Sequence, residues 1–124
     1  MKLYDLLEYA TANPFVGIVS SLDFHIKEVS VAVNASNTSS IFTNSLVRQL
    51  TDLNKLLDSA FNWNVPDPKL RSDLHGALPV ILKHVASAIT ALTSNEGPSV
   101  AHSHLMTARS VAVKRSHLTF GDIE

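Results

Sequence analysis

The sequence predicts an all-α protein: a single-domain antiparallel bundle of four long helices, preceded by a short N-terminal helix. The apolar residues recur every three or four positions over long stretches, which is typical of helices with one buried face. Proline suits the first turn of a helix, because its missing N–H has no intrahelical partner there. Three proline dipeptides each open such a stretch: Asn13-Pro14, Asp67-Pro68 and Gly97-Pro98.

A length of 124 residues suits one hydrophobic core. We assign residues 1–117 to the bundle and expect 118–124, which lack periodicity, to form a flexible tail. The first helix is predicted over residues 2–12, and Asn13-Pro14 ends it.

The second helix is predicted from Pro14 to about Asn34, because its apolar residues fall on one stripe over five turns. That stripe contains Phe15, Ile18, Val19, Leu22, Ile26, Val29 and Val33. The alternation over residues 29–33 is also compatible with a strand. No second strand-like run lies nearby to pair with it, so a helix is the better interpretation.

A polar loop over residues 34–40 leads to the third helix, which is predicted from Ser40 to about Phe61. Its apolar residues have the four-three spacing that packs along a partner helix. They are Leu46, Leu50, Leu53, Leu57 and Ala60. Arg48 and Asp52 lie four residues apart on the polar side, where we expect a solvated ion pair.

The fourth helix is predicted to begin at Pro68 and to keep one apolar face as far as Leu92. Pro79 lies inside it and cannot donate to the carbonyl of His75, so we expect a kink near Gly76-Pro79. The fifth helix is predicted from Gly97-Pro98 to about His117. Its apolar face is built mainly of small residues, so a neighbouring helix can approach closely: Ala101, Leu105, Ala108 and Ala112.

The composition excludes several classes of function. Only 17% of residues are charged and the net charge is −1, which argues against an overall electrostatic attraction to nucleic acid or anionic membranes. The chain has no cysteine, which excludes disulfides and thiolate chemistry. Charged residues interrupt both the N-terminus and the apolar region 15–33, so we expect no signal peptide, no membrane span and a cytoplasmic location.

No motif predicts catalysis, a cofactor or a metal. His102 and His104 are two residues apart, so on a helix they point about 200° away from each other. The four glycines are too widely spaced for a phosphate-binding loop, and no serine lies in a nucleophile elbow. We therefore expect no catalytic, cofactor-binding or metal-binding residues.

The best functional indication is a second apolar face on the second helix. Phe24 and Val31 lie opposite its main stripe, which predicts a surface for a protein partner or for another copy of the chain. Trp63, in the third interhelical connection, is a further candidate contact or a lid over the end of the bundle. We therefore expect a non-enzymatic interaction or assembly module, forming a homo-oligomer or binding a protein partner.

Two alternatives remain at this point. A kink at Pro79 can splay the helices and open an internal cavity for an apolar small molecule. The fifth helix carries three basic residues and no acid, which is compatible with a nucleic-acid-binding or regulatory module. Its candidate contacts are Arg109, Lys114 and Arg115.

Overall fold

The computed structural model describes residues 14–34 and 40–116, and 92% of these are helical. This part of the chain forms four α-helices: α2 (Pro14–Asn34), α3 (Ser40–Ser59), α4 (Pro68–Thr93) and α5 (Gly97–Ser116). A short 3-10 helix, η1 (Ala60–Asn62), follows α3 directly. None of the described residues is in a strand, so the all-α prediction is confirmed and residues 29–33 belong to a helix. The predicted N-terminal helix and C-terminal tail lie outside the described residues.

The helices begin where the sequence predicts. Asp67 caps α4: its carboxylate accepts hydrogen bonds from the backbone N–H groups of Lys69 and Leu70, at 2.9 and 3.4 Å. These bonds satisfy donors that have no partner inside the first turn. Gly97 opens α5 with a φ of 85°, a conformation that costs residues with a Cβ more than it costs glycine.

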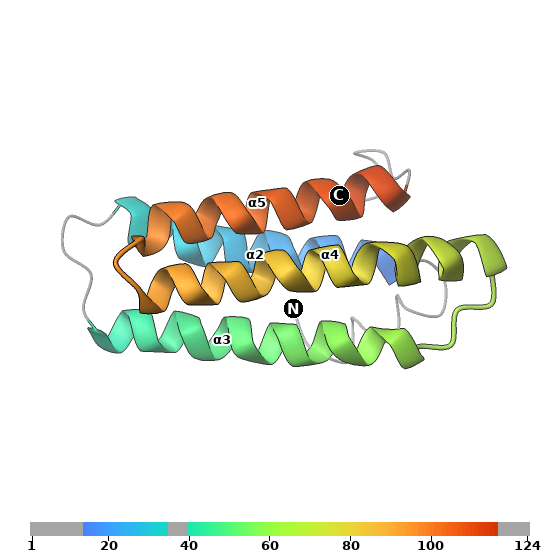
Figure 1. The fold of residues 1–124 in the computed structure, drawn as a ribbon, viewed down its shortest axis with the longest axis horizontal. Helices are drawn as coiled ribbons and strands as arrows, with labels where there is room; N and C mark the ends of the chain where they lie inside the picture. The colour runs from blue at the N-terminus through green and yellow to red at the C-terminus, as the bar shows by residue number, and fades with distance from the viewer. Residues whose placement is uncertain (1–13, 35–39, 117–124) are drawn as a thin grey trace.

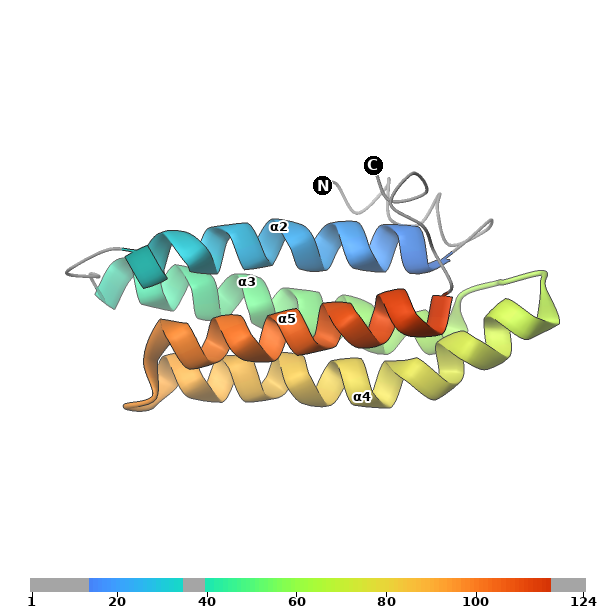
Figure 2. The same ribbon diagram turned by 90° about the horizontal axis from the view of Figure 1, so that it is seen from above.

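The four helices pack lengthwise in a ring (Figures 1 and 2). Each helix contacts the next along the chain, and α5 returns to contact α2. The contact between α4 and α5 is the most extensive, whereas the contact between α2 and α3 is the smallest of the four around the ring. The bundle is therefore tightly closed between α4 and α5 and more open between α2 and α3.

The core runs along the middle of the ring and takes residues from every helix. The predicted face of α5 is fully buried, and its small residues explain how α4 and α2 pack closely against it. The largest buried side chains come from α2, α3, α4 and α5: Phe15, Ile18, Leu22, Leu46, Leu50, Leu57, Leu74, Leu78, Ile81 and Leu105.

One position of the predicted stripe on α2 is wrong. Val33 is 40% exposed, and Ala32 is buried in its place. Successive residues of a helix point about 100° apart, so a helix that turns Ala32 inward at its last turn turns Val33 toward solvent.

Helix α4 continues through Pro79, so the chain does not break there. Figure 2 shows its first turns running at an angle to the rest of the helix. Pro79 itself is exposed, so the ring occupies the outer side of the helix, where the lost backbone hydrogen bond is accessible to water.

Candidate functional site

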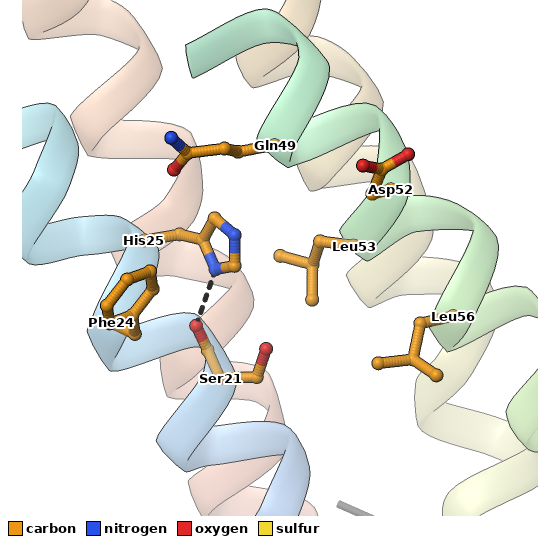
Figure 3. A pocket seen from close by; sticks show the side chains of 7 residues that line it. All are labelled: Ser21, Phe24, His25, Gln49, Asp52, Leu53 and Leu56. Atoms are coloured by element: carbon orange, nitrogen blue, oxygen red, sulfur yellow. Dashed lines mark hydrogen bonds between the residues drawn. The ribbon is translucent and has the colours of Figure 1, made fainter. Parts of the chain in front are cut away.

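A groove with a volume of about 430 Å³ lies between α2 and α3 (Figure 3). It lies where these two helices have only limited contact. Its lining combines apolar and polar side chains from both helices: Ser21, Phe24, His25, Gln49, Asp52, Leu53 and Leu56.

His25 supplies a polar group with a defined tautomer. Its Nδ1 lies 2.8 Å from the backbone carbonyl oxygen of Ser21, one turn earlier on α2. A carbonyl oxygen can only accept, so Nδ1 carries the hydrogen in this bond. In the neutral ring, Nε2 is then left with a free lone pair.

The surroundings of His25 favour its neutral form. Burial lowers the pKa of His25, and this effect outweighs the opposing influence of the Ser21 carbonyl and the Glu28 carboxylate. Phe24 contacts the imidazole edge-on, with ring centroids 5.3 Å apart and ring planes at 81°. The ring therefore has a hydrogen bond on one side and an aromatic contact on another, which together hold its orientation.

Helix α3 supplies the opposite wall. Leu53 is buried and Leu56 is half-buried, and Figure 3 shows the Leu53 side chain and the His25 ring pointing toward each other across the groove. The amide nitrogen of Gln49 donates to Ser45 Oγ at 3.3 Å. Its Oε1 is buried and has no hydrogen-bond partner, which leaves an unsatisfied acceptor at the groove.

Asp52 is the charged residue of this lining, and it is exposed at the rim. Among the described residues, the Arg109 to Asp23 contact is the single ion pair, so the predicted pair between Arg48 and Asp52 does not form. The carboxylate of Asp52 is therefore available to another cation.

The structure separates the predicted interaction residues. Phe24 is 44% exposed and lines the groove, whereas Val31 is 56% exposed two turns further along α2 and does not line it. Trp63 follows η1, where its backbone N–H donates to the Ala60 carbonyl at 3.1 Å. Its side chain is half-buried against the core. The tryptophan thus contributes to closing the bundle beside η1.

The three basic residues predicted on α5 have different surroundings. The Nε of Arg109 donates to the Asp23 carboxylate and so links α5 to α2. Arg115 lies over α4, with one guanidinium nitrogen 3.7 Å from the position that a Cβ on Gly76 would occupy. Lys114 is exposed. One of the three charges is therefore already neutralised within the bundle.

A histidine pair, which no sequence pattern indicates, joins α4 to α5. The rings of His84 and His104 have centroids 5.9 Å apart, with planes at 31°. Burial, and then the nearby His104 and Lys83, lower the pKa of His84, whose Nδ1 is buried without a partner. No group of three or more metal-ligating side chains occurs within residues 14–34 and 40–116.

Two further grooves include charged side chains in their lining. One, of about 340 Å³ between α4 and α5, is lined by His104, Lys83, Glu96 and hydroxyl-bearing residues. The other, of about 430 Å³, lies beside Pro79 between α3 and α4, and Lys55, Asp58 and Lys83 contribute to its lining. The groove at the bend of α4 thus combines charged side chains with the apolar side chains of Pro79, Leu82 and Ala86.

One described helix, α4, is long and apolar enough to cross a membrane by length and composition. Its most apolar window has a mean hydropathy of 1.4, and 39% of that window is buried inside the bundle. Core helices of folded proteins have the same properties, so this is weak evidence for a membrane span.

Comparison with known proteins adds no further constraint: no family model, no curated protein and no solved structure matches this chain.

Proposed function

We propose that this protein is a non-enzymatic assembly module, in which the outer face of α2 binds the same face of a second copy of the chain. The observation that carries this proposal is the exposure of Phe24 and Val31. These residues lie seven positions apart, so they occupy the same side of α2. Their exposure favours a surface that becomes buried on association.

Further apolar exposure occurs at the end of the bundle where α2 finishes and α3 begins. Ile41 at the start of α3 is 81% exposed. Val33 is also exposed, but it follows Val31 by two residues and so lies on the opposite side of α2. A stable interface buries about 800 Å² on each partner, which requires more than two side chains. Ile41 would supply a further part of that area where the partner reaches the start of α3.

The proposed bundle is antiparallel. Figure 1 places the connection from α3 to α4 at one end and the connection from α4 to α5 at the other, which supports an up-and-down course. Short connections between long helices also favour antiparallel neighbours. Two copies related by a two-fold axis would then pair α2 with α2, so that each Phe24 faces the other chain.

The solution mass tests this proposal. The monomer mass is 13.5 kDa, so light scattering across a concentration series should show a larger species for the wild-type protein. The double variant Phe24→Glu and Val31→Lys should stay helical and lose the larger species. Charges at a wet surface cost little, whereas unpaired charges in an interface cost several kcal/mol.

A matched control uses Ser103→Glu with Ser110→Lys, which places the same charges seven residues apart at exposed positions of α5. This control should associate as the wild type does. A monomeric wild type, or equal association of both double variants, would overturn the proposal. Unfolding of the Phe24 and Val31 variant would show that this face belongs to the core.

A nucleic-acid-binding role has weaker support. Arg109 forms an ion pair with Asp23, and Arg115 packs over α4. Of the three predicted nucleic-acid contacts, Lys114 has neither of these two contacts. Phosphate binding needs several available cations to give useful affinity. The cytoplasmic location remains part of the proposal and agrees with the absence of cysteine.

A further inference from the structure

We infer that the groove between α2 and α3 binds a small amphipathic organic cation, with an apolar body and a protonated amine as its head. The proposal goes beyond the assembly function, since it concerns a small molecule and the groove between α2 and α3; Phe24 belongs to both surfaces, whereas Val31 belongs to the assembly surface alone. It is carried by three features of the lining: apolar walls, an excess of hydrogen-bond acceptors, and an unpaired carboxylate.

The walls suit the apolar part of such a ligand. Leu53 and Leu56 form the α3 side, and Phe24 contributes a partly exposed aromatic ring from α2. Burial of an alkyl or phenyl group against these side chains removes apolar surface from water on both partners. The edge-on contact with His25 holds the Phe24 ring beside the groove, where its face can also receive a cation.

The polar atoms of the groove are mainly acceptors. His25 Nδ1 is committed to the Ser21 carbonyl, so the neutral ring offers Nε2 as a lone pair. Gln49 uses its amide nitrogen on Ser45, while its Oε1 is buried without a partner. The Ser21 hydroxyl can take either role. A ligand head that donates several hydrogen bonds fits this set, and a carboxylate head does not.

The charge of the groove points the same way. Asp52 is the acidic residue of the lining, and no ion pair within the described residues involves its carboxylate. An ammonium group would donate a charge-assisted hydrogen bond to this carboxylate, and an anion would be repelled by it. Asp52 therefore selects the sign of the ligand, and the leucines select its apolar body.

Three probe molecules separate these contributions, because they share one body and differ only in the head: 4-phenylbutylamine, 4-phenylbutan-1-ol and 4-phenylbutanoate. We expect the amine to bind about tenfold more tightly than the acid at pH 7.5, which is the ratio that one charge-assisted hydrogen bond supplies. Chemical-shift changes in two-dimensional NMR spectra give the affinities, and they also report whether the residues of the groove respond.

Two aspartates of α3 provide a matched pair of variants. Asp52→Asn should remove the preference for the amine over the alcohol. Asp58→Asn, at an exposed position that lines the neighbouring groove instead, should leave it unchanged. Both aspartates are exposed, so neither change should unfold the protein. Equal affinities for amine and acid, or equal effects of the two substitutions, would overturn the proposal.

The assembly proposal can fail separately. Val31 does not line the groove, so Val31→Lys can weaken self-association without changing the lining. Preferential amine binding should persist in this variant. If this variant loses both its self-association and its preference for the amine over the acid, the proposal that the groove of a single chain binds the amine is overturned. The amine would then bind at the interface between two copies of the chain.

Discussion

Two leucines of α3 provide a quantitative test of how open the α2 and α3 side of the bundle is. Leu50 and Leu53 are both buried, and they are three residues apart on one helix. Leu50 lines none of the three grooves, whereas Leu53 forms part of the wall of the groove between α2 and α3. The same substitution to alanine therefore opens a closed cavity at one position and enlarges an open groove at the other.

The expected costs follow from this difference. Each Leu→Ala change removes three carbon atoms from the apolar interior, which costs about 2.4 kcal/mol at about 0.8 kcal/mol per buried methylene group. A cavity that stays empty adds about 24 cal/mol for each Å³. We therefore expect a loss of about 3–5 kcal/mol for Leu50→Ala and about 2–3 kcal/mol for Leu53→Ala, where water can fill the vacated space.

Urea unfolding followed by circular dichroism measures both free energies of unfolding, provided that the two variants and the wild type unfold with the same dependence on urea. The difference of about 1–2 kcal/mol between the variants exceeds the usual error of a midpoint comparison. A Leu53→Ala variant that loses as much stability as Leu50→Ala would refute the reasoning, because it would mean that the groove is closed in solution.

Four further substitutions test the local interpretations. Asp67→Ala should cost about 1 kcal/mol in urea unfolding, since two backbone donors at the start of α4 lose their acceptor; an unchanged midpoint would contradict the capping role. Gly97→Ala should also cost about 1 kcal/mol, because the φ of 85° is unfavourable for alanine and no neighbouring atom would compensate. Burial lowers the pKa of His25 below its unfolded value of 6.5, so the unfolded state binds more protons and the free energy of unfolding should fall as the pH drops through 6.5. His25→Gln should lessen this fall between pH 7.5 and 5. An unchanged dependence of the free energy of unfolding on pH would contradict the burial of a neutral imidazole. Gln49→Leu should raise stability by about 1 kcal/mol by removing an unsatisfied acceptor, while it weakens amine binding; a loss of stability would mean that Oε1 has a partner in solution.

The sequence predicted the helices well because their signals are local. Proline and capping residues mark the starts of α2, α4 and α5, and the apolar periodicity within α5 identified its buried face. The error at Val33 has the same local origin: at the last turn, two adjacent apolar residues compete for the inward position, and spacing alone does not decide between them.

The features of the site were harder to predict because each one joins different helices. His84 meets His104, and Arg109 meets Asp23, across separations that no periodicity encodes. The groove itself depends on how far α2 stands from α3, which is a property of the packed bundle. The apolar spacing predicts an outer position for Phe24 on its helix, but it does not predict that Phe24 lies beside Gln49 and Asp52 of α3.

The position of the groove follows from the residues at each contact between neighbouring helices, which we call a seam. Small residues on α5 let α4 and α2 approach it closely, so those seams close by apolar packing. The seam between α2 and α3 instead contains Ser21, His25 and Gln49, whose polar atoms are costly to bury. Leucines at these positions would build a tighter and more stable seam. Buried polar atoms without a partner also occur at Asn54 and His84. At the contact between α2 and α3 such a costly group lines a concave site, which is the pattern expected where a surface serves binding rather than folding.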